Sequence, residues 1–274
     1  MSDQVVLTLR SVPSAALDAG CVAPDRFSSM SEHEIAGLEV WSESEGRGTL
    51  GDYFTVRGER SARVRVEGDL SRVDALGQSM AGGELSLIGD TGAGVGARMT
   101  DGRLLAEGNT GADAGREMRG GALIVSGNAG ANAGGAGPGA NRGMTGGELI
   151  VLGSSGPGAA ARVRRGLIFI GGEVAANAGQ TMIAGTLVAM GRLAPDAGRW
   201  MKRGSIIALG GVEISATYRY ACTYRPPHVR QILNYLRGRY GVPVTPAQVG
   251  GTFRRYSGDL AEQGKGEILE WTTA

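Results

Sequence analysis

The sequence predicts an all-β protein whose central part is a right-handed parallel β-helix. Three observations predict this fold. A G-x-x-M-x-x-G pattern recurs between Gly77 and Gly210, a five-residue apolar run follows each copy, and 49 of the 274 residues are glycine. Successive copies are 19 residues apart, with a single step of 26. A repeat of about twenty residues is typical of solenoid proteins.

Three columns of the repeat carry residue types that suit the corners of a coil. The methionine column contains Met80, Met99, Met118, Met144, Val163, Met182 and Met201. A first glycine column contains Gly83, Gly102, Gly121, Gly147, Gly166, Gly185 and Gly204, and a second contains Gly89, Gly108, Gly127, Gly153, Gly172, Gly191 and Gly210. Methionine is unbranched and adapts to an irregular corner. Glycine suits a corner that needs positive φ or has no room for a Cβ atom.

Each repeat contributes one short strand. The runs between the glycine columns are ELSLI, RLLAE, ALIVS, ELIVL, LIFIG, TLVAM and SIIAL, which are mostly β-branched or aliphatic. Since no repeat has room for a crossover helix, successive strands lie parallel only if the chain coils, with rungs about 4.8 Å apart. The expected inward ladder contains Leu85, Leu104, Leu123, Leu149, Ile168, Leu187 and Ile206.

Charge and cysteine content favour a protein that binds neither nucleic acid nor membrane. The formal net charge is +1, although 26 of the 28 basic residues are arginine. Cys21 and Cys222 are far apart and form no C-x-x-C motif, so neither zinc nor an iron–sulfur cluster is indicated. The chain shows no signal sequence and no apolar run long enough to span a membrane. We therefore expect a cytoplasmic protein.

The expected organisation has three parts, a cap at 1–60, the β-helix at 61–215 and an appendage at 216–274. In the cap, Gln4–Leu9 and Gly51–Gly58 are predicted strands. Ser31 and Glu34 form a capping box that predicts a helix through Ile35 to Leu38. Arg63–Glu67 alternates as the first coil would.

The appendage contains the one strong helix pattern of the chain. It begins at Pro226 and Pro227, repeats apolar residues from Val229 to Tyr240, and stops at Gly241. We expect this helix to plug the second end of the β-helix. Beyond it, Phe253–Tyr256 and Glu267–Trp271 are predicted short strands in an extended arm that binds a partner.

One loop interrupts the regular coil. Seven extra residues lengthen the segment Gly127–Gly143 between Met118 and Met144. Insertions in a solenoid emerge on one face, often the working one, so this loop is either a partner contact or a flexible surface loop. The G-x-G spacing near Gly92 does not open a helix, and no G-K-[ST] follows the glycines of the loop, which argues against a nucleotide site.

No pattern in the sequence indicates a catalytic, cofactor-binding or metal-binding residue, and none is predicted. The two histidines, His33 and His228, are far apart and are expected to face solvent. A set of arginines on adjacent turns is predicted either to aid solubility or to guide an acidic ligand. It contains Arg162, Arg164, Arg165 and Arg199.

The ends of the chain carry a resemblance to a known family. Cys21–Trp41 (CVAPDRFSSMSEHEIAGLEVW), Leu50-Gly51-Asp52, and the tail segments Gly258–Glu262 (GDLAE) and Gly264–Leu269 (GKGEIL) resemble the C subunit of formylmethanofuran dehydrogenase and of its bacterial relative, the formyltransferase/hydrolase complex. The resemblance spans nearly the whole chain. The repeats alone also resemble the C-terminal domain of the glutamate synthase large subunit, so they specify the fold more than the family.

The resemblance implies a structural subunit of the bacterial complex in methylotrophic one-carbon metabolism. Such a complex moves a formyl group from formyl-tetrahydromethanopterin to methanofuran and hydrolyses the product to formate during formaldehyde oxidation. Its formyltransferase subunit and its amidohydrolase-like hydrolase subunit would be the partners. Methanofuran and zinc would belong to those subunits, and no cofactor to this chain.

Two alternatives stay open at this point. The first is the C subunit of a molybdenum or tungsten formylmethanofuran dehydrogenase, which is disfavoured because the arginine bias suggests a GC-rich bacterial genome. The second is a free-standing β-helix enzyme acting on polysaccharide, which would need a carboxylate cluster along one groove.

Overall fold

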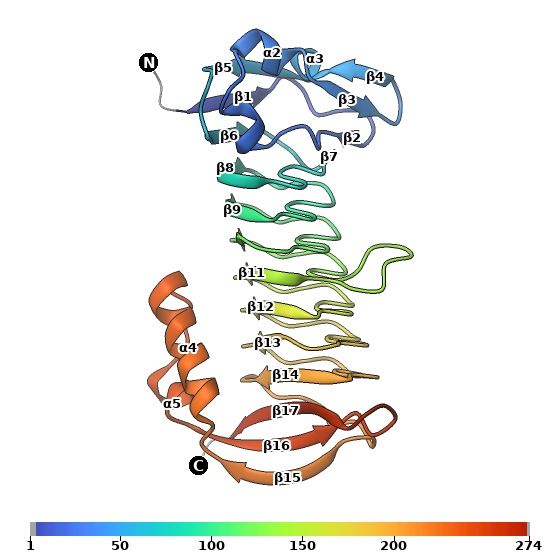
Figure 1. Ribbon diagram of the computed structural model, residues 1–274, viewed down its shortest axis with the longest axis vertical. Helices are drawn as coiled ribbons and strands as arrows, with labels where there is room; N and C mark the ends of the chain where they lie inside the picture. The colour runs from blue at the N-terminus through green and yellow to red at the C-terminus, as the bar shows by residue number, and fades with distance from the viewer. Residues whose placement is uncertain (1–3, 273–274) are drawn as a thin grey trace.

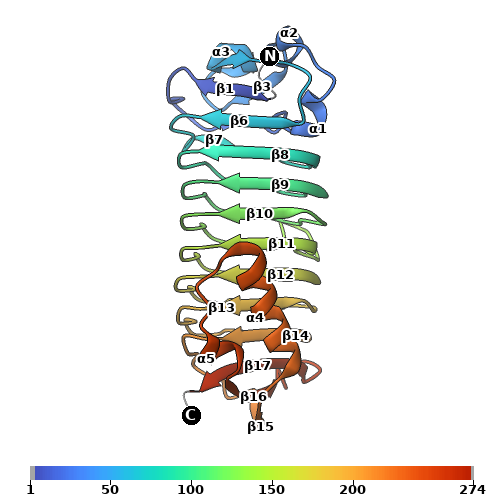
Figure 2. The same cartoon turned by 90° about the vertical axis from the view of Figure 1, so that its left-hand side faces the viewer.

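The computed structural model describes residues 4–272 and has an elongated shape (Figure 1). An N-terminal cap covers one end of a long coil, and C-terminal strands cover the other (Figures 1 and 2). The main sheet has 13 strands in the order β15-β16-β17-β14-β13-β12-β11-β10-β9-β8-β6-β1-β5. One contiguous core runs from Val5 in the cap to Ile268 near the C-terminal end.

The predicted strand ladder is confirmed. The parallel coil strands are β6 (Arg63–Glu67), β8 (Ala81–Ile88), β9 (Asp101–Ala106), β10 (Ala122–Val125), β11 (Thr145–Val151), β12 (Arg165–Ile170), β13 (Thr186–Ala189) and β14 (Arg203–Ala208). Leu85 pairs with Leu104, Leu104 with Leu123, and the register continues unbroken to Ile206. All seven predicted ladder residues are buried. The result is a β-helix-like coil of parallel strands.

A second, weaker ladder runs down the opposite side of the coil. Single-residue parallel bridges join Leu70, Thr91, Thr110, Ala129, Ser155, Val174, Leu193 and Val212 in succession. Each of these positions from Thr91 onward follows the second glycine column by two residues. One bridging residue per coil is too short to produce the alternating pattern by which a strand is predicted, so the sequence did not reveal it.

The methionine and glycine columns occupy the positions expected of them. Every methionine of the column, and Val163 in its place, is fully buried. The first glycine column has positive φ throughout, for example 91° at Gly102. At Gly108 in the second column, an added Cβ would lie 2.6 Å from the carbonyl oxygen of Gly89 in the preceding coil. The two columns therefore require glycine for different reasons, backbone conformation and lack of space.

A ladder of polar side chains links successive coils at one corner. The amide nitrogens of Asn109 and Asn128 each donate to the side-chain oxygen one coil earlier, on Asp90 and Asn109, at 2.8 Å. Ser154 donates likewise to Asn128 at 2.8 Å, and Glu173 to the Ser154 hydroxyl at 3.1 Å. These bonds satisfy backbone donors that lie outside both strand ladders.

The cap combines two small sheets with three short helices. Strands β1 (Val5–Leu9) and β5 (Phe54–Arg57) extend the main sheet beyond β6. A second sheet contains β4 (Gly46–Thr49), β3 (Glu39–Ser42), β2 (Leu17–Asp18) and β7 (Val73–Asp74). The helices are α1 (Pro24–Phe27), α2 (Glu32–Ala36) and α3 (Leu50–Tyr53).

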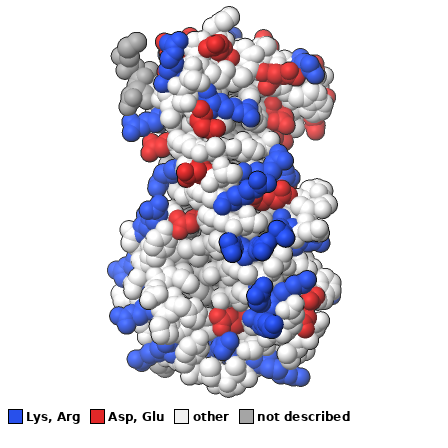
Figure 3. Space-filling view, viewed as in Figure 1, with Lys and Arg blue, Asp and Glu red and all other residues white. Residues whose placement is uncertain are grey.

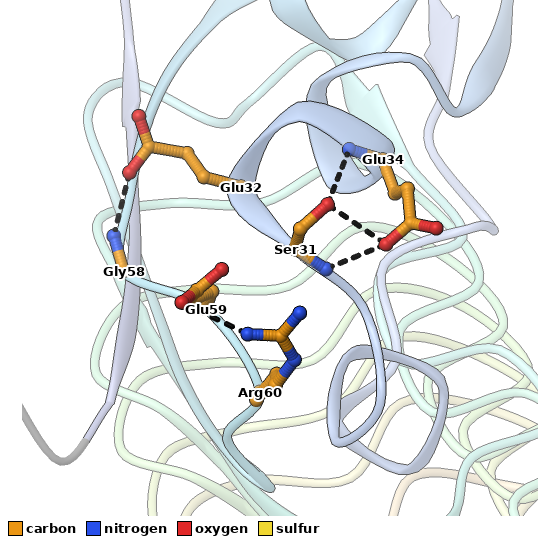
Figure 4. Close-up of polar contacts among 6 residues, drawn as sticks. All are labelled: Ser31, Glu32, Glu34, Gly58, Glu59 and Arg60. Atoms are coloured by element: carbon orange, nitrogen blue, oxygen red, sulfur yellow. Dashed lines mark hydrogen bonds and ion pairs between the residues drawn. The ribbon is translucent and has the colours of Figure 1, made fainter.

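The predicted capping box begins α2 (Figure 4). The Glu34 amide donates to the Ser31 hydroxyl at 3.3 Å, and the Ser31 amide donates to the Glu34 carboxylate at 2.8 Å. Glu32 accepts a bond from the Gly58 amide at 3.1 Å and so attaches α2 to the chain that follows β5. These contacts hold the cap helix over the first coil.

The cap differs from the sequence prediction at two boundaries. Helix α2 ends at Ala36 rather than Leu38. The predicted strand Gly51–Gly58 begins only at Phe54, because Thr49 and Asp52 form a second capping box that makes Leu50–Tyr53 helical. The Thr49 amide donates to the Asp52 carboxylate at 2.7 Å.

The C-terminal elements are β15 (Arg219–Tyr224), α4 (Pro227–Tyr240), α5 (Pro246–Val249), β16 (Thr252–Gly258) and β17 (Lys265–Thr272). The predicted helix is confirmed, and Gly241 ends it in the left-handed conformation with φ of 65°. Both predicted strands are present as parts of β16 and β17.

Two expectations about the appendage are wrong. The segment after Gly241 is not an extended arm, because β17 pairs in parallel with β14 and adds a further rung, with Ile268 opposite Ile206. Helix α4 does not plug the coil but lies along its side (Figure 2). The end is instead filled by Tyr218, whose buried hydroxyl donates to the Gly198 carbonyl at 2.9 Å.

Candidate interaction surfaces

Helix α4 covers an apolar strip on the outside of the coil. Along β11 and β12, Leu149 and Ile168 point into the coil, while Ile150 and Phe169 point outward, as alternation in a strand requires. The outward residues form a second core with the buried side of α4, which consists of Val229, Leu233, Leu236 and neighbouring residues. The strands beneath α4 are thus apolar on both faces, which explains runs such as LIFI.

A polar contact fixes the far end of α4. The Tyr240 hydroxyl donates to the Glu148 carboxylate on β11, and the Arg239 guanidinium lies 3.6 Å from the same carboxylate. Burial, and then the hydrogen bond to Glu148, raise the pKa of Tyr240 to about 12. The helix is therefore held by apolar contacts along its length and by this contact at its C-terminal end.

The outer side of α4 borders a groove, which we call the basic groove. Its volume is about 760 Å³, and its walls include Arg225, Arg230, Asn234 and Arg237 together with Pro246 of α5. These five side chains are exposed. In Figure 3, basic side chains follow the left-hand edge of the lower half of the molecule, which α4 and α5 form in the same view of Figure 1.

The insertion projects from a corner of the coil beside β11 (Figure 1). The extra residues are 136–142, because Gly134 and Met144 are hydrogen-bonded to each other as the equivalent residues are in the neighbouring coil. Three contacts hold the loop to the coils on either side. Glu117 accepts from the Gly137 amide at 2.9 Å, Asn132 donates to the Ala136 carbonyl at 3.0 Å, and Arg162 donates to the Ala140 carbonyl at 2.9 Å.

The predicted arginine set does not form one cluster. Arg162 holds the loop, and its backbone amide bonds to Gln180 in the next coil, whereas the carbonyl of Arg199 bonds to Thr181 from the coil beyond. One whole coil therefore separates Arg162 from Arg199. The Arg199 guanidinium stacks 4.4 Å from the Trp200 ring and lies 3.8 Å from Asp196.

The histidines are widely separated, as expected. His33 is exposed on α2 in the cap, and His228 is exposed in the first turn of α4, with its Nε2 atom 3.6 Å from Glu267. Within residues 4–272, no group of three or more His, Cys, Asp and Glu side chains is placed to hold a metal ion. The residues of this chain therefore do not fit a zinc site, and the assignment of no metal-binding residue stays a prediction.

Neither cysteine is paired. Burial raises the pKa of the Cys21 thiol to about 11, which makes it a poor nucleophile, and Cys222 is exposed on β15. In the part of the chain that the structure describes, no helix has the length and apolar character needed to cross a membrane.

Sequence reasoning missed the basic groove. Its signal is present in the composition, since residues 214–258 contain seven arginines and neither aspartate nor glutamate. The overall charge of +1 hides this local excess. The pairing of α4 with α5 across the groove could not be read from the sequence, because the expected helix position was at the end of the coil.

The fold and these surfaces define a class of protein, an elongated β-helix-like subunit that is closed at both ends and presents a helix-bordered groove and a corner loop. Comparison with known proteins agrees with this class. A chain in the crystal structure of the formyltransferase/hydrolase complex (FhcABCD) from Methylorubrum extorquens in complex with methylofuran superposes with a TM-score of 0.89. It is 35% identical, and the match covers 98% of this chain and 100% of that chain.

Curated relatives match over a shorter stretch. The C subunit of the tungsten-containing formylmethanofuran dehydrogenase 2 of Methanothermobacter wolfeii is 32% identical over 99 residues, which are 34% of this chain and 36% of the relative. The C subunit of the molybdenum-containing formylmethanofuran dehydrogenase 1 of Methanosarcina barkeri is 31% identical over 96 residues, 32% of this chain and 31% of the relative. The chain thus matches about a third of the length of these relatives. No protein-family model matches it.

The chain belongs to the family of formylmethanofuran dehydrogenase C subunits, which includes the matching chain of the formyltransferase/hydrolase complex. The family predicted from the ends of the sequence is therefore confirmed.

Proposed function

We propose that this chain is a structural, non-catalytic subunit of a formyltransferase/hydrolase complex. The complex would convert formyl-tetrahydromethanopterin, through formylmethanofuran, to formate. The observation that carries this proposal is the end-to-end match to a chain of such a complex, at 35% identity and over 98% of this chain. The partners would be a formyltransferase subunit and an amidohydrolase-like hydrolase subunit.

The interior of the coil supports a structural role. Cleavage of an amide-like formyl bond needs an activated water, supplied by a metal or by an oriented base. Formyl transfer needs a site that positions both large cofactors. The methionine and leucine columns fill the inside of the coil, which leaves the outer surface for contacts with other chains. Zinc and methanofuran are accordingly assigned to the partner subunits.

Several finer features belong to the same proposal. We assign a right-handed coil, because parallel strands joined by crossovers are right-handed in nearly all known proteins. The cap at 1–60 and the coil at 61–215 would form the frame, and the segment 216–274 would contact partners. The two free cysteines, Cys21 and Cys222, support a cytoplasmic setting.

A second candidate is the C subunit of a molybdenum or tungsten formylmethanofuran dehydrogenase. The names of the curated relatives support it, but their matches span only about a third of either chain. Purification of the native complex through a tag on this chain, with mass identification of the subunits and metal analysis, separates the candidates. Zinc with transferase and hydrolase subunits supports the first, and molybdenum or tungsten supports the second.

Activity of the purified chain tests the non-catalytic role. The chain alone is expected neither to hydrolyse formylmethanofuran nor to transfer a formyl group, whereas the complex does both. Turnover by the isolated chain that is lost in His33→Ala or His228→Ala would overturn this part of the proposal, while the identity of the complex would stand on the subunit analysis.

A further inference from the structure

The basic groove has a regular arrangement of side chains. Along α4, Val229, Leu233 and Leu236 are buried against the coil. Arg230, Asn234 and Arg237 each follow one of these buried residues in the sequence and are exposed. A step of one residue turns the direction of a side chain by about 100° around a helix, so these polar residues form a stripe beside the buried one. Helix α5 and the residues Val249–Gly251 form the facing wall.

The positive charge of this groove is not balanced within the described chain. Residues 214–258 contain no acidic side chain, and the acidic residues that reach this region from elsewhere pair with other cations. Glu267 lies 2.8 Å from Arg255 and 3.6 Å from His228, and Glu148 lies 3.6 Å from Arg239. Across residues 4–272, no ion pair involves the three groove arginines, which are Arg225, Arg230 and Arg237.

We propose that the basic groove binds an acidic, extended segment of a partner protein. Guanidinium groups bind carboxylates through paired, charge-assisted hydrogen bonds. Arg230 and Arg237 lie about 10 Å apart along the helix axis at 1.5 Å per residue. An extended peptide covers about 10 Å in three residues, so carboxylates at every third position match this spacing. This inference deepens the proposed function, because it states the chemistry of one partner contact.

The walls of the groove favour a peptide over the other anionic partners. Proteins that hold single-stranded nucleic acid stack its bases on aromatic side chains, and the described lining residues are arginine, proline, glutamine, asparagine, valine and glycine. A lipid surface would require a row of exposed large apolar side chains beside the charges, and this lining does not supply one. Pro226, Pro227 and Pro246 give the groove stiff edges that suit an extended chain.

A peptide-binding measurement on the full-length chain tests this proposal. The probe is a fluorescently labelled peptide with the repeat Glu-Ser-Gly, and the reference peptide has Gln in place of Glu. The groove variant carries Arg225→Gln, Arg230→Gln and Arg237→Gln. The matched control carries Arg98→Gln, Arg192→Gln and Arg203→Gln, which remove three exposed arginines elsewhere on the coil. Thermal melting verifies that both variants remain folded.

The acidic peptide is expected to bind the wild type and the control variant alike, and the groove variant at least about tenfold more weakly, which corresponds to about 1.4 kcal/mol. Binding should also weaken as salt is raised. Equal losses in both variants, or equal binding of the Gln peptide, would overturn the proposal. Tighter binding of a single-stranded oligonucleotide of the same charge, at physiological ionic strength, would overturn it in favour of a nucleic-acid site.

Recovery of the complex separates this inference from the proposed function. If tagged wild-type chain recovers no transferase or hydrolase subunit but still binds the acidic peptide in the groove, the proposed function fails and the groove assignment stands. If wild type and groove variant recover every partner equally and the peptide does not bind, the groove assignment fails and the proposed function stands.

Discussion

The hydroxyl group of Tyr240 donates a hydrogen bond to the carboxylate of Glu148, which lies 92 residues earlier in the chain. This contact joins the last residue of α4 to β11. It fixes how far the helix extends along the coil and therefore where the basic groove lies.

Replacement of Tyr240 by phenylalanine should loosen that end of α4. The ring would keep its apolar contacts, so the loss is the hydrogen bond to a charged group, which is worth about 1.5 kcal/mol or more when such a bond is removed. Urea unfolding would measure the loss, with Tyr220→Phe, an exposed tyrosine on β15, as the control. Equal stability of wild type and Tyr240→Phe would show that the contact contributes nothing.

The same contact predicts a pH dependence. The pKa of Tyr240 is raised from 10 to about 12, so the folded chain favours the neutral hydroxyl. Its contribution to stability is therefore complete below about pH 10 and is lost as the pH rises through 12. The stability difference between wild type and Tyr240→Phe should decrease over this range. A difference that grows with pH would contradict the assignment.

Leu187→Asp tests the register of the coil. Leu187 is fully buried on β13 between Ile168 and Ile206, so a carboxylate there would be an unpaired charge in apolar surroundings. The expected loss is about 3 to 5 kcal/mol, which is enough to unfold many domains. Lys202→Asp, at an exposed position, is the control. Melting temperatures that fall equally in both variants would contradict the inward position of Leu187.

Deletion of residues 136–142 should leave the coil intact. Gly135 and Gly143 would then follow each other as Arg116 and Glu117 do in the preceding coil, and glycine at 143 can adopt the positive φ of 56° found at Glu117. The melting temperature should change little. If the loop contacts a partner, recovery of the complex through a tag on this chain should fall. A large drop in melting temperature would mean that the loop supports the coil itself.

Truncation after Gly241 should destabilise the protein. It removes β16 and β17, which leaves one edge of β14 unpaired and deprives both cores of buried residues such as Ile268 and Leu269. An exposed sheet edge also promotes aggregation. Thermal melting and size-exclusion chromatography would measure the effect. A truncated chain as stable as the full one would restore the detachable arm that the sequence favours.

The sequence predicted the coil well because each rung repeats the same local constraints. Leu85 to Ile206 could be aligned from spacing alone, and Met80 to Met201 marked a corner that every coil shares. The position of α4 was not predictable in this way. Its apolar side fits any apolar surface, and the outward strip of Ile150, Phe169 and Val188 was read only as strand content, although runs apolar at every position indicate burial on both faces.

The surfaces were predicted less well, because they depend on contacts between distant segments. Arg162 and Arg199 lie on the same side of the repeat in sequence, yet an intervening coil separates them. Arg225, Arg230 and Arg237 line one groove only because α5 folds back beside α4. Neither arrangement follows from the local pattern of the chain.

The unbroken register of the coil makes its length a counted quantity. Each coil adds one strand spacing of about 4.8 Å, and fractions of a coil would misplace every inward side chain. Removal of residues 99–117, one full repeat, would join Arg98 to Met118 and preserve the column at that corner. The cap and the groove would then move closer by a single step. A partner that spans both would meet the chain as a gauge, whose calibration lies in the number of methionines.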